Sequence, residues 1–120
     1  MILMELTKEN FQKLDEIHLS TNNRQSMAEI LAILSKSYIE ITQSGIVTDY
    51  EYYKSLTSLS TNPLEIIHYN IKIIDQTKVL SYYKLKDTVT NTYTMRSNLW
   101  VLEDGNWKLA FHQGTKIFAP

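Results

Sequence analysis

Apolar residues recur at helical spacing in the N-terminal part of the chain. From Glu5 to about Leu19 they follow one another every three or four positions, which predicts an amphipathic helix, with Thr7 placed to cap its first turn. Ser26–Glu29 has the Ser-x-x-Glu spacing of a capping box, in which serine and glutamate each satisfy a free backbone N–H group. A second, short helix is therefore expected to end near Leu34.

The pattern then changes to the two-residue period of a strand. Ile39 and Ile41 fall on one face of this predicted strand, and Tyr38, Glu40 and Thr42 fall on the other. After a turn at Ser44-Gly45, the stretch Thr48–Glu51 repeats the capping-box spacing and predicts a third helix to about Leu59. The tyrosines of that helix, Tyr50, Tyr52 and Tyr53, are expected to serve packing rather than chemistry.

Beyond Asn62-Pro63 the pattern is that of strands. Leu64–Asp75 reads as one long strand, with Ile67, Tyr69, Ile71 and Ile73 on one face, and Val79–Lys86 reads as the next. A hairpin between Arg96 and Thr115 follows, because Asp104-Gly105 separates two apolar-rich runs. Helices followed by a run of strands predict one α+β domain over residues 1–120, with the helices packed on one face of a strongly curved antiparallel sheet.

The register of this hairpin decides which side chains share a face. A two-residue turn sets Trp100 and Leu102 beside Trp107, Leu109 and Phe111, and pairs Arg96 with Gln113. A three-residue loop, Glu103–Gly105, is the register favoured here, because it gathers Leu99 and Val101 with the apolar residues of the second strand. It sets Arg96 directly across from His112, on a face shared by Asn98, Trp100 and Ala110. Since that second face is also partly apolar, the sequence predicts that both faces are covered, one by the helices and one by a second copy in a homodimer.

Composition and charge narrow the classes of partner. With 43% hydrophobic and 21% charged residues the chain is typical of a soluble globular domain. The net charge is −1 and only Arg24 and Arg96 among the twelve basic residues are arginines, so no nucleic-acid partner is expected. There is no cysteine, which excludes disulfides and thiolate metal sites and fits a cytoplasmic protein.

Other motifs argue against membranes and cofactors. The N-terminus lacks the features of a signal peptide, and no apolar run approaches the roughly 20 residues of a membrane helix. His18 and His68 lack the spacing of paired metal ligands, and Gly45, Gly105 and Gly114 form no phosphate-binding loop. We therefore expect no metal, no cofactor and no membrane partner.

Several motifs resemble a known superfamily. Arg96-Ser-Asn-Leu-Trp100, Glu103-Asp-Gly-Asn-Trp107 and Phe111-His-Gln-Gly-Thr115 are similar to the C-terminal hairpin of the nuclear transport factor 2-like superfamily. Tyr38-Ile-Glu40-Ile, Ser44-Gly45 and the start of the helix at Asp49–Tyr53 extend the likeness upstream. The nearest match is an uncharacterised, largely bacterial branch related to the SnoaL-like and ketosteroid-isomerase-like proteins and to the calcium/calmodulin kinase association domain.

The resemblance implies a cystatin-like, cone-shaped α+β fold. It implies a cavity between the helices and the concave sheet, and commonly a dimer through the outer sheet face. The superfamily includes isomerases, cyclases, dehydratases, transport factors and oligomerisation modules, so it implies no single activity. The positions that match the motifs of the branch are Glu40, Arg96, Trp100, His112 and Gln113, whereas Asn98 departs from the small hydroxyl residue more usual there.

Three functions follow as hypotheses. In the first, a cavity lined by Tyr38, Glu40, Arg96, Asn98, Trp100 and His112, with Gln113 as a further ligand contact, binds a small anionic or polar-aromatic molecule. In the second, Glu40 or His112 is the general base of an isomerase, dehydratase or cyclase. Against that role, Glu40 is expected to form a structural ion pair with Arg96. In the third, the domain is a non-catalytic dimerisation module.

Overall fold

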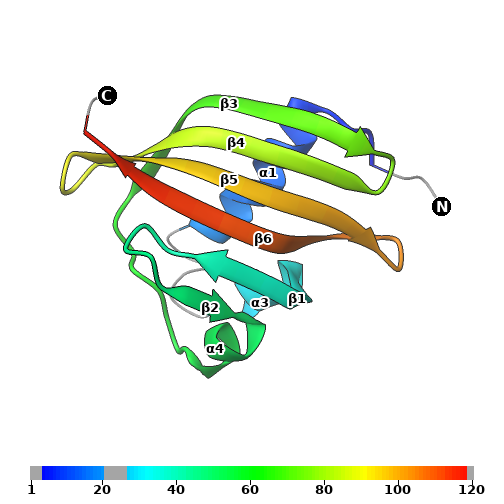
Figure 1. The fold of residues 1–120 in the computed structure, drawn as a ribbon, viewed down its shortest axis with the longest axis horizontal. Coiled ribbons are helices and arrows are strands. Elements are labelled where there is room, and N and C mark those ends of the chain that lie inside the picture. The colour runs from blue at the N-terminus through cyan, green and yellow to red at the C-terminus, as the bar shows by residue number, and fades with distance from the viewer. Residues whose placement is uncertain (1–3, 21–26, 119–120) are drawn as a thin grey trace.

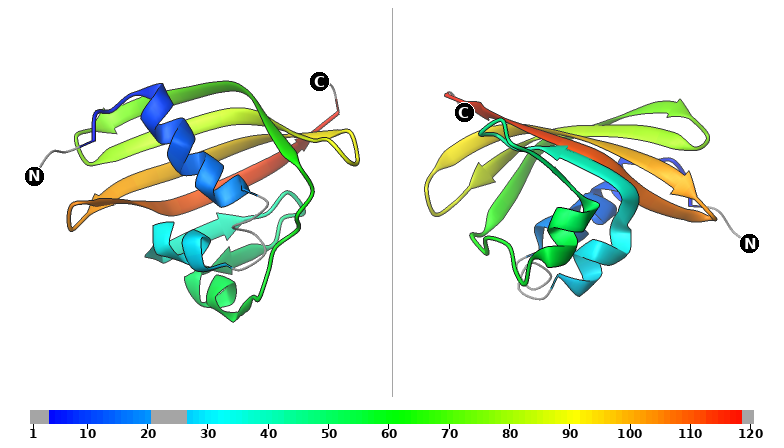
Figure 2. Two further views of the ribbon diagram at one scale, coloured as in Figure 1. Left: turned by 180° about the vertical axis from the view of Figure 1, so that it is seen from behind. Right: turned by 60° about the horizontal axis from the view of Figure 1, so that its bottom comes forward.

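The computed structural model describes residues 4–20 and 27–118 and measures 43 × 31 × 25 Å. Three helices in this part of the chain lie on one side of a six-stranded, curled sheet that does not close (Figures 1 and 2). The helices are α1 (Lys8–Leu19), α3 (Ala28–Ile33) and α4 (Tyr50–Ser55). The strands are β1 (Leu34–Ile41), β2 (Val47–Asp49), β3 (Leu64–Asp75), β4 (Lys78–Asp87), β5 (Thr92–Glu103) and β6 (Asn106–Ile117).

The sheet confirms the predicted α+β cone, with one difference in strand direction. Its strand order is β2-β1-β6-β5-β4-β3, and neighbouring strands are antiparallel except β1 and β6, which are parallel. Figure 2 shows α1 running across the face of the four C-terminal strands while α3 and α4 lie beside β1 and β2. No helix in the described ranges is long and apolar enough to span a bilayer.

The helix ends confirm one predicted cap and correct another. Thr7 caps α1, since its hydroxyl oxygen accepts from the Asn10 N–H at 3.2 Å, as predicted. Ser26, the expected cap of the second helix, lies outside the described residues. The predicted role of Thr48 is wrong, because Asp49 caps α4 by accepting from the Tyr52 N–H at 2.9 Å. Thr48 is a strand residue whose hydroxyl donates to Glu40, and α4 ends at Ser55 rather than near Leu59.

Strand β3 has the predicted bounds but not the predicted faces. His68 has a φ of 53°, and the pairing of β3 with β4 shifts between Ile67 and Asn70. This bulge turns the strand over, so that Ile66, which the alternation set opposite Tyr69, packs with it against the core. The alternation rule fails here because the bulge adds a residue to the strand, and no glycine in the sequence marks its position.

The hairpin has the two-residue turn, so the predicted three-residue loop is wrong. Glu103 pairs with Asn106, and Asp104 and Gly105 both have positive φ, of 50° and 81°. Two consecutive positive φ values are characteristic of the type I′ turn, whose twist matches that of the flanking strands.

A bulge in β6 then changes the register beyond the turn. Trp100 pairs with Leu109 and Leu99 with Phe111, which leaves Ala110 without a partner. Asn98 consequently pairs with His112, and Arg96 pairs with Gly114 instead of His112. The bulge restores the predicted grouping of Arg96, Asn98, Trp100 and His112 on one face, although Leu109 joins that face as well.

The inner face of the sheet and the helices enclose the core. Phe11, Ile30, Tyr38, Trp100 and Leu109 are among its fully buried residues. The Phe11 ring meets the Trp107 ring edge-on, with centroids 5.0 Å apart. Polar side chains are also buried at the centre of this interior. Buried polar groups are stable only when they are hydrogen-bonded, so each of these side chains needs a partner.

Candidate functional site

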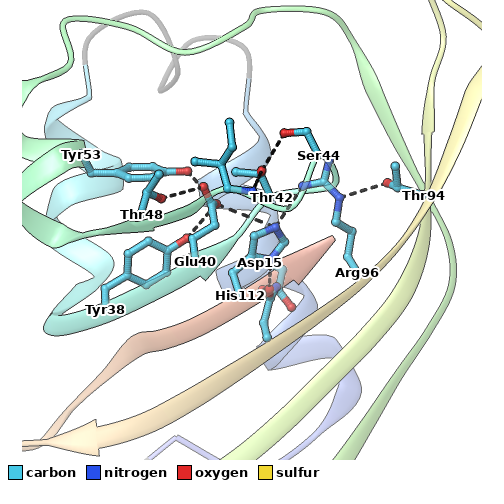
Figure 3. A network of polar contacts seen from close by, with 12 residues as sticks. Asp15, Tyr38, Glu40, Thr42, Ser44, Thr48, Tyr53, Thr94, Arg96 and His112 are labelled. Carbon is cyan, nitrogen blue, oxygen red and sulfur yellow. Dashed lines mark hydrogen bonds and ion pairs between the residues drawn. The ribbon is translucent and has the colours of Figure 1, made fainter. Parts of the chain in front are cut away.

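A network of polar side chains lies between the helices and the inner face of the sheet (Figure 3). Strand alternation places many of its members on this face, because they occupy every second position of β1, β4 and β5, and the others come from α1, α4, β2, β3 and β6. The network has two parts, one around Glu40 and one around Asp15, and the imidazole of His112 joins them. Its members are Asp15, Tyr38, Glu40, Thr48, Tyr53, Tyr69, Ser81, Tyr83, Arg96, Asn98, Trp100 and His112.

Glu40 is buried and accepts hydrogen bonds from three hydroxyl groups. Its Oε1 accepts from Tyr38 Oη at 3.0 Å and from Tyr53 Oη at 2.8 Å, and its Oε2 accepts from Thr48 Oγ1 at 3.3 Å. Burial, with the nearby Tyr53 and Glu40, raises the pKa of Tyr38 far above its usual value, so this tyrosine stays a donor. Tyr53, expected only to pack, therefore also helps to hold the carboxylate.

The predicted ion pair between Glu40 and Arg96 is absent. His112 stands between them, with its Nε2 3.9 Å from Glu40 Oε1 and 3.1 Å from Arg96 Nη1 (Figure 3). The parallel register of β1 and β6 sets Glu40 beside His112, and the β6 bulge moves Arg96 one position further along, opposite Gly114. These two pairings place the imidazole where the sequence suggested a direct salt bridge.

Arg96 packs closely against Gly114 of strand β6, where the missing side chain leaves room for it. A Cβ atom added at Gly114 would lie 3.2 Å from Arg96 Nε and 3.3 Å from its Cδ. Arg96 Nε donates to Thr94 Oγ1 at 3.0 Å. A pocket of about 70 Å³ opens beside this guanidinium, and its other lining residues are Gln43, Leu64, Leu85, Asp87, Thr92 and Thr94.

Asp15 is the centre of the second part of the network and was not among the predicted site residues. It is 0% exposed. Its Oδ2 accepts from Tyr69 Oη at 2.6 Å and Ser81 Oγ at 2.7 Å, while its Oδ1 accepts from Asn98 Nδ2 at 2.7 Å and Trp100 Nε1 at 3.0 Å. Burial raises the pKa of Asp15, and the four hydrogen bonds oppose that rise without cancelling it.

The sequence did hold one signal for Asp15. Phe11, Asp15 and Leu19 follow one another at i, i+4 spacing, so the carboxylate sits in the apolar stripe of α1. A charged residue in such a stripe indicates a buried partner. The identity of the partners was not accessible, because they come from β3, β4 and β5, more than 50 positions away.

The remaining predicted residues divide between interior and surface. Tyr38 and Trp100 are fully buried and Asn98 is 2% exposed, so none of the three offers an appreciable surface to a ligand. Gln113 is exposed on the outer face, paired with Ser97 and Ile41, and lies apart from the network. Among residues 4–20 and 27–118 no group of three histidine, aspartate or glutamate side chains is arranged to hold a metal ion.

The fold has clear counterparts among solved structures. No protein-family model matches the sequence, and no curated protein does. A candidate ketosteroid isomerase from Parabacteroides distasonis has a TM-score of 0.76 at 13% identity, over 96% of this chain and 91% of that one. An NTF2-like protein of unknown function from Prochlorococcus has a TM-score of 0.74 at 17% identity, over 98% and 97% of the two chains. A candidate calcium/calmodulin-dependent kinase II association domain from Exiguobacterium sibiricum has a TM-score of 0.70 at 18% identity, over 98% and 99%.

These comparisons establish the nuclear transport factor 2-like fold for this chain, as its motifs suggested. The matches extend over almost the whole of each chain. At identities of 13% to 18% they define the fold, and the function has to be argued from the site.

The raised pKa of Asp15 predicts a pH dependence of stability. Because its pKa is higher in the folded protein than in the unfolded chain, its contribution to stability is greatest below the unfolded value and falls as the pH rises to the folded value. We expect Asp15→Asn to remove this loss, which amounts to about 1.4 kcal/mol for each unit of pKa difference. Asparagine keeps an oxygen for Asn98 and Trp100 and offers an amide to the two hydroxyl groups.

Urea unfolding of both proteins between pH 4 and pH 8 measures the difference. The wild-type free energy of unfolding should fall relative to that of Asp15→Asn as the pH rises. A difference that stays constant over the whole range contradicts the assignment.

Proposed function

We propose that the domain binds a small organic anion beside Arg96, where β4 ends and β5 begins. The observation that carries the proposal is the guanidinium of Arg96, which is partly buried yet has no carboxylate within 4.0 Å among residues 4–20 and 27–118. A cation that has lost part of its hydration gains from a desolvated anion, and a planar guanidinium can bind a carboxylate through two parallel hydrogen bonds.

The hydrogen bonds of Arg96 leave one nitrogen of its guanidinium group, Nη2, for a ligand. Nε donates to Thr94 and Nη1 donates to His112, while no acceptor in the described part of the protein takes Nη2. The adjoining pocket of about 70 Å³ has room for a carboxylate and its neighbouring carbon, at roughly 30 Å³ for each water-sized group. The rest of a ligand would extend towards solvent.

Asp87, which also lines this pocket, is held away from the guanidinium. Its carboxylate accepts from Asn62 Nδ2 at 3.0 Å and from the N–H groups of Val89 and Thr90 at 3.0 and 3.1 Å. These hydrogen bonds, led by that of Asn62, lower the pKa of Asp87. The carboxylate therefore stabilises the turn between β4 and β5, and Arg96 is left as the charge that faces a ligand.

Removing the guanidinium tests the proposal. We expect Arg96→Met to weaken the binding of isobutyrate about 10- to 100-fold, the range for one charge-assisted hydrogen-bonded contact. Binding is followed by the chemical shifts of the Thr94 and Gly114 amides as isobutyrate is added. The matched control is Lys13→Met on the exposed side of α1, which makes the same change in net charge. Equal affinities in wild type and Arg96→Met would refute the proposal.

Proton transfer is a second candidate function, favoured by the position of His112 Nε2 between Glu40 and Arg96. The oxygens of Glu40 already accept from three hydroxyl groups, so His112 is the better placed of the two predicted bases. Arg96 Nη1 donates to Nε2, so His112 can take a proton only when a bound ligand draws Nη1 away from it. Glu40, at 3.9 Å, would then stabilise the imidazolium.

This candidate predicts hydrogen exchange on a bound carboxylic acid. In deuterium oxide, proton NMR should detect loss of the hydrogen on the carbon next to the carboxylate, at a rate that falls at least 100-fold in His112→Gln. Glu40→Gln should retain part of the rate, because it leaves Nε2 in place. In the contrary case, the wild-type protein binds isobutyrate or 2-hydroxyisobutyrate and catalyses no exchange on any tested acid that has a hydrogen on carbon 2. That result would refute proton transfer and leave binding as the function.

The outer sheet face supports the predicted homodimer. Ile39, Phe111, Leu99 and Leu80 lie side by side in one row across β1, β6, β5 and β4. Ile39, Tyr82 and Met95 on the same face are each about 40% exposed. A contiguous apolar row of this kind is stabilised when a second copy covers it.

A charge at the centre of this row should disrupt the dimer. We expect Leu99→Glu to be monomeric by light scattering at concentrations where the wild type is a dimer. Thr90→Glu, in the exposed turn between β4 and β5, is the control for added charge and should leave the dimer intact. A wild type that is monomeric at millimolar concentration would exclude the dimer.

A further inference from the structure

We infer that the binding of an anion to Arg96 is coupled to the uptake of a proton by His112, so that the site binds anions more tightly as the pH falls. The inference rests on the proposed binding of an anion by Arg96 and adds the regulation of that site. It follows from the single lone pair of His112 Nε2 and from the opposite charges on its two sides.

The contact between Arg96 and His112 requires a neutral imidazole. Arg96 Nη1 lies 3.1 Å from His112 Nε2 and can only donate, so Nε2 accepts through its one lone pair. A proton on Nε2 would set two N–H groups against each other, and a positive guanidinium at this distance also disfavours a positive imidazole ring. Arg96 therefore keeps His112 neutral for as long as this contact lasts.

A bound carboxylate competes with His112 for Nη1 of Arg96. Thr94 Oγ1 already accepts from Arg96 Nε at 3.0 Å, so the two parallel N–H groups that a carboxylate prefers have to come from Nη1 and Nη2. Arg96 lines the pocket of about 70 Å³, whereas His112 does not line it and is only 3% exposed. The ligand therefore acts on His112 through the guanidinium and needs no contact with the imidazole.

Glu40 favours the protonated imidazole once the guanidinium is paired with a ligand. Its Oε1 lies 3.9 Å from His112 Nε2, and Arg96 lies on the other side of the ring (Figure 3). The carboxylate of Glu40 and the guanidinium of Arg96 balance each other around a neutral His112. A bound carboxylate adds a negative charge to this group, and a proton on Nε2 restores the balance.

The other nitrogen of the imidazole keeps its partner when Nε2 takes a proton. His112 Nδ1 is hydrogen-bonded to Asn98 Oδ1, and the amide is held in this orientation because Asn98 Nδ2 donates to Asp15. A carbonyl oxygen can only accept, so Nδ1 carries a proton in the neutral ring and in the imidazolium alike. Only the contact between Nη1 and Nε2 has to break.

Titratable groups on other elements also face His112 or its partner Glu40. They are His18 and Asp15 on α1, Tyr38 on β1 and Tyr53 on α4. The two tyrosines donate to Glu40, whereas the ring centroid of His18 lies 5.9 Å from that of His112, and Asp15 reaches His112 through Asn98. Since His18 and Asp15 can also bind a proton, the experiment has to identify the group that titrates.

An NMR titration of the His112 ring, with and without isobutyrate, identifies that group. The His112 signals are assigned by their loss in His112→Gln, or by through-bond correlation if that variant does not fold. We expect saturating isobutyrate to raise the titration midpoint of His112 by about one pH unit, which corresponds to tenfold coupling. An unchanged His112 midpoint in the complex, whether or not His18 or Asp15 responds, would overturn the inference.

The affinity for isobutyrate should show the same coupling, because the effect of a proton on a ligand equals that of the ligand on the proton. Affinity is highest below the His112 midpoint of the free protein and falls as the pH rises to the midpoint of the complex. We expect the dissociation constant, followed by the Thr94 and Gly114 amides, to increase about 10-fold from pH 5.5 to pH 8. Isobutyrate stays ionised throughout, since an ordinary carboxyl group titrates near pH 4.

Two variants show whether His112 causes this pH dependence. In His112→Gln the side-chain amide can still accept from Arg96 Nη1 but cannot take a proton, so the dissociation constant should not depend on pH. His68→Asn is the matched control, because it removes an exposed histidine with a φ of 53°, which asparagine tolerates. This control should keep the pH dependence of the wild type.

The coupling and the anion site can fail separately. Wild-type protein that binds isobutyrate equally well at pH 5.5 and pH 8 would refute the coupling and leave anion binding intact. A pH dependence that persists in His112→Gln would also refute it. If isobutyrate binds at neither pH, the proposed function fails and the coupling fails with it.

Discussion

The buried carboxylate of Asp15 is the constraint on which the interior of this protein depends. It is fully enclosed, and no cation among the described residues compensates it, so four neutral donors must hold it. Those donors belong to β3, β4 and β5, and the acceptor belongs to α1. The helix can therefore dock on the sheet in one position along its axis, because apolar contacts alone would tolerate a shift that these hydrogen bonds do not.

The same hydrogen bonds set the direction of donors and acceptors in the candidate site. Trp100 and Arg96 are donors that cannot reverse, and between them Asp15, Asn98 and His112 have one consistent arrangement of protons. Glu40 completes the surroundings of His112 without neutralising Arg96. A site in which the base and the cation are both oriented before a ligand arrives suits binding, because little has to be reorganised when the ligand enters.

Two bulges decide how sequence position translates into side-chain direction. Alternation predicted that Arg96, Asn98, Trp100 and His112 share a face, and they do, although the turn has two residues rather than three, because the unpaired Ala110 compensates. In β3 no such compensation occurs, and the bulge at His68 places Ile66 and Tyr69 on the same side. Bulges form where curvature of the whole sheet requires them, so neither was visible in the local pattern.

The sequence by itself determined the order of helices and strands, the Asp-Gly reversal and part of the set of polar residues directed into the cone. Local propensities, caps and the two-residue period of strands are enough for these features. Only the tertiary structure decided the partners of those residues: Asp15 at the centre, His112 rather than Arg96 beside Glu40, and Gln113 on the outer face. Each of these depends on contacts between strands or helices distant in the chain, and their register is set by the packing of the whole sheet rather than by neighbouring residues.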